Sequence, residues 1–97
     1  MPPTYHVFPE FWRDYERLSP DQRERFRTAV DDLVEDLDNG DGFRKGLRVK
    51  GVRGRDGIFE MTWDMANNGR ATFNYGTSIR DGLPHIEWRG VGDKSIL

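Results

Sequence analysis

The chain has 97 residues, a formal net charge of −2 at pH 7 and no cysteine, which excludes a disulfide framework and a cysteine-based metal site. This length predicts one domain, residues 1–97, whose single modest core is filled by large aromatic side chains. No apolar run approaches the roughly 18 residues of a membrane span, and the first residues lack the features of a signal peptide, so we expect a cytoplasmic protein.

The small net charge hides two opposed blocks. Residues 31–41 contain no base and six acids, which are Asp31, Asp32, Glu35, Asp36, Asp38 and Asp41. Residues 44–55 contain no acid and six bases, which are Arg44, Lys45, Arg48, Lys50, Arg53 and Arg55. Two interpretations stay open: the blocks neutralise each other in the fold, or the basic block binds phosphates or an acidic protein.

The N-terminal residues predict a strand followed by a helix. Residues 4–8 alternate as in a short strand, with His6 and Phe8 on the same side. Residues 9–18 predict a short amphipathic helix, because apolar residues recur at i, i+4 and i+7.

A second, longer helix is predicted from the cap at Ser19 to about Leu37. Gln22 completes a capping box at its start, and Gly40 supplies a left-handed stop, so the two helices should form a hairpin. Bases lie near the start of this helix and acids near its end, which opposes the helix dipole. Only the basic block of residues 44–55 could neutralise the acids at the end of this helix, so we expect the acidic and basic blocks to lie close together.

The remaining sequence predicts four strands, at residues 47–52, 58–64, 70–75 and 85–91. The predicted fold is therefore α+β and two-layered. The N-terminal strand and the helical hairpin pack on one face of a mainly antiparallel sheet of four or five strands. The opposite face of the sheet, flanked by the basic block, is the candidate site and should carry Glu60, Thr62, Thr72, Asn74, His85, Glu87 and Arg89.

The element order, the Phe-rich helical hairpin and two local motifs resemble the RelE/ParE superfamily of small toxins from toxin–antitoxin pairs. One motif is the Lys/Arg-rich strand leading into GIFEMTW, which resembles the Gly-aromatic-Glu-Leu-Arg strand of HigB-like members. The other is the ending WRGVGDKSIL, which resembles the Ile-Gly-His-Arg ending of RelE- and YoeB-like members. The resemblance covers nearly the whole chain. It implies a RelE-like, microbial-RNase-like fold whose RNA site lies on the concave sheet face.

The resemblance implies the toxin of a type II pair, an mRNA interferase that cleaves mRNA on the ribosome and so inhibits translation. Its implied partners are a cognate antitoxin, mRNA and the ribosome, with no small-molecule cofactor. Cleavage by the ribose 2′-OH needs a base, cations for the phosphate charge and an acid for the leaving oxygen. The residues expected to catalyse this step are Lys50, Arg53, Glu60, Arg89 and Lys94. The residues expected to bind RNA are Arg44, Lys45, Arg48, Arg55 and His85.

Each candidate also has a structural interpretation. The bases at Lys50, Arg53 and Arg55 could protect an exposed edge strand against pairing with another chain. Glu60 could form a cross-strand ion pair with Arg89 or Arg53. His85 could be a polar residue at a strand end without a role in chemistry.

Three departures from the family pattern leave other functions open. Thr62 stands where the family strand carries arginine, Asp93 stands where the terminal motif has histidine, and Leu97 stands where relatives have a catalytic tyrosine. A non-catalytic RelE-fold module that binds RNA or protein is therefore one alternative, and a ParE-like inhibitor of DNA gyrase is another. No metal site is expected, since His6 and His85 have no clustered carboxylate partners.

Overall fold

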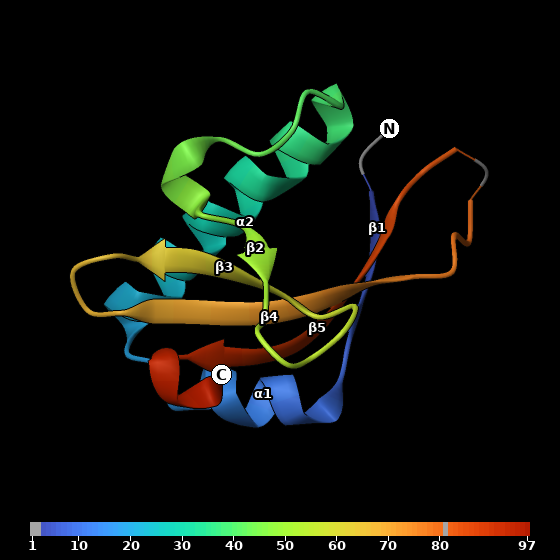
Figure 1. The fold of residues 1–97 in the computed structure, drawn as a ribbon. Coiled ribbons are helices and arrows are strands. Elements are labelled where there is room, and N and C mark those ends of the chain that lie inside the picture. The colour runs from blue at the N-terminus through green and yellow to red at the C-terminus, as the bar shows by residue number, and fades with distance from the viewer. Residues whose placement is uncertain (1–2, 81) are drawn as a thin grey trace.

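The computed structural model describes residues 3–80 and 82–97, and it has two α-helices packed on a five-stranded sheet (Figure 1). Across the sheet, the strand order is β1 (Thr4–Val7), β5 (His85–Gly92), β4 (Gly69–Gly76), β3 (Phe59–Asp64) and β2 (Lys50–Gly51). β1 pairs with β5 in parallel and every other pair is antiparallel. The predicted α+β architecture with a mainly antiparallel sheet is confirmed.

The two helices begin and end close to the predicted residues. α1 spans Pro9–Glu16 and α2 spans Pro20–Asn39. The predicted capping box of α2 is formed: the Ser19 amide donates to Gln22 Oε1 at 2.8 Å, and the Gln22 amide donates to Ser19 Oγ at 3.2 Å. Gly40 ends α2 in the left-handed conformation with φ of 74°, which glycine adopts without steric cost.

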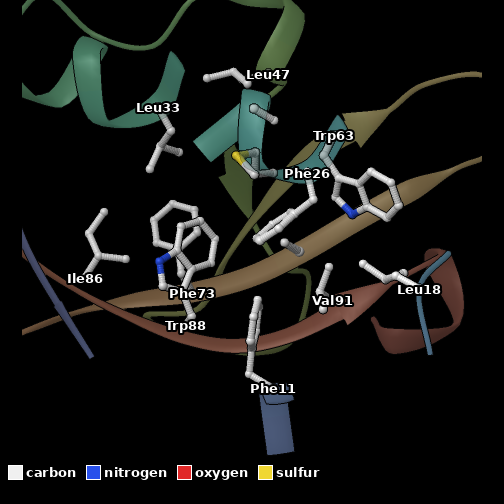
Figure 2. Packing of buried hydrophobic residues seen from close by; sticks show 13 residues of the cluster. Phe11, Leu18, Phe26, Leu33, Leu47, Trp63, Phe73, Ile86, Trp88 and Val91 are labelled. Carbon is white, nitrogen blue, oxygen red and sulfur yellow. The ribbon is translucent and has the colours of Figure 1, made fainter. Parts of the chain in front are cut away.

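Aromatic rings join both helices to the same face of the sheet. Phe11 of α1 lies 6.1 Å from the Trp88 ring and Phe26 of α2 lies 5.7 Å from it, measured between ring centroids. The Phe11 and Phe26 rings also meet each other, at 5.6 Å. Figure 2 shows these rings gathered with Leu33, Trp63, Phe73 and Val91 in one cluster, all of them buried. The core is thus a single layer between the helices and the sheet.

The predicted strand at residues 47–52 is wrong in most of its length. A 3-10 turn, η1 (Lys45–Leu47), replaces its start, and only the two residues of β2 pair with β3. Arg48 has a positive φ of 47°, which no extended strand tolerates. The turn allows both Leu47 and Val52 to be buried, which a straight strand could not do because residues five apart point to opposite faces.

The C-terminal end of the chain packs on β5 beside α1, because the side chains of Ile96 and of Asp14 in α1 both approach Gly90. A second 3-10 turn, η2 (Lys94–Ile96), contacts β4 and β5. A Cβ atom placed on Gly92 would lie 3.1 Å from Cγ2 of Ile96, so the Ile96 side chain lies directly over this glycine. None of the helices among the described residues is both long enough and apolar enough to cross a membrane.

Candidate nucleic-acid interface

Strand register builds a polar face on the side of the sheet opposite the helices. Glu60 pairs with Lys50 on one side and with Thr72 on the other. Thr62 pairs with Arg70 in the next row towards η2. Because side chains alternate between the two faces of a sheet, these residues share one face while Met61, Ala71 and Phe73 face the core. We refer to this surface as the polar face.

A carboxylate with two cations lies at the centre of the polar face. Glu60 Oε1 is 3.8 Å from Arg70 Nε and 3.9 Å from Lys50 Nζ. The side chains of Glu60 and Arg70 are only 8% and 7% exposed, whereas Lys50 is 62% exposed. The expected partners of Glu60, Arg89 or Arg53, are therefore wrong, because the register places Lys50 and Arg70 beside the carboxylate instead.

Arg70 was not among the candidate residues predicted from the sequence. The alternation of residues 70–75 placed Thr72 and Asn74 on the polar face, and the same period also places Arg70 there. The sequence pattern does not indicate that Arg70 is buried. Arg70 is covered at its end of the sheet by η2, since Ile96 lies over Gly92 and Gly92 is the register partner of Arg70.

Arg44 is separated from the other bases because acids of α2 bind it. Its Nε and Nη2 atoms donate to the two carboxylate oxygens of Asp36 at 3.0 and 2.9 Å, and Nη1 lies 3.2 Å from Asp32 Oδ1. These side-chain hydrogen bonds from Arg44 lower the pKa of Asp36 and raise that of Arg44. The expected proximity of the two charge blocks is confirmed, and Arg44 makes this contact.

The other bases of the block point into solvent without anionic partners. Lys45, Arg48, Arg53 and Arg55 are all exposed. Within residues 3–80 and 82–97, no carboxylate lies within 4.0 Å of their cationic atoms. Arg53 and Arg55 lie in the loop between β2 and β3, which turns at two glycines with positive φ, Gly54 and Gly57. Lys45 and Arg48 precede β2 and Arg53 and Arg55 follow it, so together with the exposed Lys50 they form a run of exposed cations, which we call the cationic patch.

A second polar cluster lies at the β1 end of the same face. Arg89 Nη1 donates to Asn74 Oδ1 at 2.8 Å, and Asn74 Nδ2 donates to Glu87 Oε1 at 2.7 Å. The Arg89 guanidinium lies over the Phe8 ring, with 4.9 Å between its central carbon and the ring centroid. Arg89 is therefore held away from Glu60, beside β1.

Two more of the predicted site residues lie at the margins of the polar face. His85 is buried at the end of β5, and its Nδ1 atom shares a 2.7 Å hydrogen bond with Thr4 Oγ1. Lys94 is exposed in η2. The neighbouring Asp93 accepts a hydrogen bond from the Ser95 amide at 2.8 Å, and hydrogen bonding from Ser95 lowers the pKa of its carboxyl group.

The centre of the polar face is buried, since Glu60, Thr62, Arg70 and Thr72 are each at most 6% exposed. Two cavities of about 670 and 560 Å³ border α2, and neither is lined by Glu60, Arg70, Asn74 or Arg89. Sites for small molecules are usually enclosed and mostly apolar, so a polar surface flanked by exposed cations better suits an extended polymer. Among the described residues, no group of three His, Cys, Asp or Glu side chains is placed to hold a metal ion.

No family model and no curated protein matches the sequence, but solved structures match along its whole length. A chain of the E. coli DinJ–YafQ toxin–antitoxin complex matches with a TM-score of 0.66 at 10% identity, over 100% of this chain and 98% of that chain. The free E. coli toxin RelE, in a mutant form, matches at 0.61 and 14% identity, over 99% and 87%. The chain has the fold of RelE and YafQ toxins.

The RelE-like fold extends to an archaeal structure. A chain of the RelB–RelE antitoxin–toxin complex from Methanococcus jannaschii matches with a TM-score of 0.60 at 14% identity, over 93% of this chain and 91% of that chain. The expected RelE-like fold is therefore confirmed. Identities of this size establish the architecture, and the function has to be argued from the side chains of this chain.

Proposed function

We propose that the chain is the toxin of a type II toxin–antitoxin pair and that it cleaves mRNA on the ribosome. The observation that carries this proposal is the run of exposed cations in the cationic patch, one of which, Lys50, lies 3.9 Å from the carboxylate of Glu60. Single-stranded RNA is bound by positively charged surfaces that follow its phosphates. Lys45, Arg48 and Arg55 would contact the backbone on either side of the scissile phosphate.

The polar face offers the groups that the cleavage step needs. In this step the ribose O2′ attacks phosphorus, the bond from phosphorus to O5′ breaks, and a 2′,3′-cyclic phosphate and a 5′-hydroxyl result. Glu60 would accept the proton of the 2′-OH, and Lys50 and Arg53 would stabilise the additional phosphate charge. Lys94, exposed on η2, would deliver the proton that O5′ requires.

In this proposal Arg70 is a positioning residue. Its guanidinium lies 3.8 Å from Glu60, donates from Nη1 to the Gly69 carbonyl at 3.0 Å, and is almost fully buried. It therefore holds the carboxylate in place from the protein side and leaves Lys50 on the solvent side. The cytoplasm is the compartment in which this activity would meet translating ribosomes, and a small antitoxin would bind the chain until release.

Two observations favour a second candidate, a non-catalytic module that binds RNA or protein with the same face. Glu60 is already balanced by two cations and has little exposed surface. In addition, Thr62 supplies no cation beside Arg70. Such a module would retain RNA binding through the cationic patch while lacking cleavage.

Induction in cells followed by mapping of mRNA 5′ ends tests the proposal. We expect growth arrest and new ends that keep a fixed phase relative to codons, and we expect co-expression of the antitoxin to suppress both. Intact mRNA with damaged or relaxed DNA would instead indicate a gyrase inhibitor. Intact mRNA without growth arrest would instead support the non-catalytic binding module.

A paired substitution tests whether the cationic patch is the working surface. Lys50→Ala with Arg53→Ala should abolish arrest while the protein stays folded. Arg13→Ala with Arg17→Ala is a matched control, because it removes two exposed bases from the helix layer and should leave arrest unchanged. For the isolated protein and single-stranded RNA, the Lys50/Arg53 pair should lower the slope of log K against log salt by about 1.4, roughly 0.7 for each lost contact.

A further inference from the structure

We propose that the cluster of Arg89, Asn74 and Glu87, together with His6 and Phe8, is a subsite that reads one base of the bound strand and prefers guanine. The inference rests on the proposed function in that the bound polymer is RNA. It adds a specificity site that is separate from the Glu60 cluster.

The first step is the fixed arrangement of the three polar side chains. Asn74 lies between Arg89 and Glu87, donating to the carboxylate and accepting from the guanidinium. Because arginine only donates and an ionised glutamate only accepts, the orientation of the Asn74 amide follows from its neighbours. The second N–H of the amide donates to the Tyr75 carbonyl at 3.4 Å, so Asn74 is fully engaged and holds Glu87 and Arg89 in a fixed arrangement.

The second step is the hydrogen-bonding capacity that remains unused. Among the described residues, Arg89 has one hydrogen-bond partner for its five N–H groups, and Oε2 of Glu87 has none. Both side chains are half-buried, so they are partly ordered and still reachable from solvent. The cluster can therefore accept hydrogen bonds at Glu87 and donate them at Arg89.

The third step matches these groups to the bases. On its Watson–Crick edge, guanine carries the acceptor O6 next to two donors, N1–H and N2–H₂. A carboxylate can accept from both donors while an arginine donates to O6. Adenine and cytosine each place a ring-nitrogen acceptor where Glu87 needs a donor, and uracil offers a single donor between two acceptors. Guanine is therefore the base that satisfies Glu87 and Arg89 together.

The fourth step is a surface on which a base can stack. His6 is exposed on β1 and is the register partner of Glu87. Its ring meets Phe8 edge to face, with 5.2 Å between the centroids, and Phe8 in turn supports Arg89. RNA-binding proteins commonly stack unpaired bases on aromatic side chains and read their Watson–Crick edges.

The fifth step is the distance to the proposed cleavage centre. Asn74 and Thr72 are two residues apart on β4, and Thr72 is the register partner of Glu60. Two residues of a strand span about 7 Å, so one RNA strand can contact both clusters. Gly76 makes room for the Glu87 side chain, because a Cβ atom there would lie 2.8 Å from Cδ of Glu87.

Titration of the full chain with GMP and with AMP, followed by NMR, tests the inference without requiring cleavage. We expect GMP to shift the amide signals of residues 74 and 87–89 and to bind about tenfold more tightly than AMP, since one well-formed pair discriminates by roughly that factor or more. Equal affinities, or shifts confined to other residues, would overturn the inference.

Glu87→Gln is the matched variant, because it keeps the size of the side chain, removes its charge and replaces one acceptor oxygen with an NH₂ donor. It should lower the GMP:AMP affinity ratio towards one, whereas Lys50→Ala with Arg53→Ala should weaken both nucleotides and leave the ratio unchanged. An unchanged ratio in Glu87→Gln would refute the guanine subsite. Guanine preference without any mRNA cleavage would contradict the proposed function alone, and cleavage whose base preference survives Glu87→Gln would contradict this inference alone.

Discussion

Replacing Arg70 with methionine tests how the centre of the polar face is held. The substitution leaves the carboxylate of Glu60 buried, with only the exposed Lys50 as a partner at 3.9 Å. At the 3.8 Å separation of Arg70 and Glu60, the attraction of the two charges is about 4 kcal/mol for an effective dielectric constant near 20. Removing one partner of a buried pair typically costs about 3–5 kcal/mol. Because Lys50 remains, we expect Arg70→Met to lose about 3 kcal/mol, at the low end of that range.

Urea denaturation measures this loss. For a chain of this size, a slope of roughly 1 kcal/mol per molar urea converts about 3 kcal/mol into a midpoint lowered by about 3 M. Lys50→Met is the matched control, since loss of the exposed partner should cost less than about 1 kcal/mol. The double variant Glu60→Gln/Arg70→Met should regain most of the stability, because no buried charge is then left alone. An Arg70→Met variant as stable as the wild type would refute the reasoning.

Three further predictions concern the fold. Ser19→Ala should lower the stability of the protein by about 1 kcal/mol in thermal unfolding, because it removes the cap of α2; a loss of the same size from Thr77→Ala, at an exposed position outside the helices, would contradict this. Phe26→Ala should cost about 3–5 kcal/mol in urea titration, since its ring contacts both the Phe11 and Trp88 rings. The lowered pKa of Asp36 means that the unfolded chain binds more protons around its ordinary pKa of 3.8. The stabilisation contributed by the contact of Asp36 with Arg44 should therefore be present above that pH and be lost as the pH falls through the folded pKa. Arg44→Ala should remove this part of the pH dependence.

Local signals in the sequence are enough to predict α2. Ser19, Gln22 and Gly40 act within one turn of the helix ends, so their effect does not depend on the rest of the fold. The four longer strands also follow from short-range alternation. The core face was predictable for the same reason, because Met61, Trp63, Phe73 and Trp88 all face the helices.

The sequence was less informative where distant segments meet. The basic block has strand-like alternation, but burial of Leu47 and Val52 bends it through η1 and the positive φ of Arg48. The charge of Arg44 was predicted to bind phosphate, while its contacts are with the acids of α2. These outcomes depend on tertiary packing, which overrides local propensity.

The candidate site was also predictable from the sequence only in part. Alternation placed Glu60 and Arg89 on one face, and this placement is confirmed by the strand register and by the contact of Arg89 with Asn74. The partners of Glu60 depend on which residues face it across β2 and β4. That register is set by the β2–β3 loop and the β3–β4 turn, so Lys50 and Arg70 emerged only from the structure.

The central claim is that Glu60 and the adjacent cations cleave RNA on the ribosome. The most direct measurement is the rate of mRNA cleavage in purified ribosomes programmed with a defined message, for the wild type and for Glu60→Gln of verified fold. The account predicts cleavage that requires the ribosome and falls by at least about 100-fold in Glu60→Gln, the usual size of a general-base contribution. Wild-type cleavage that is undetectable, or that Glu60→Gln leaves unchanged, would contradict it.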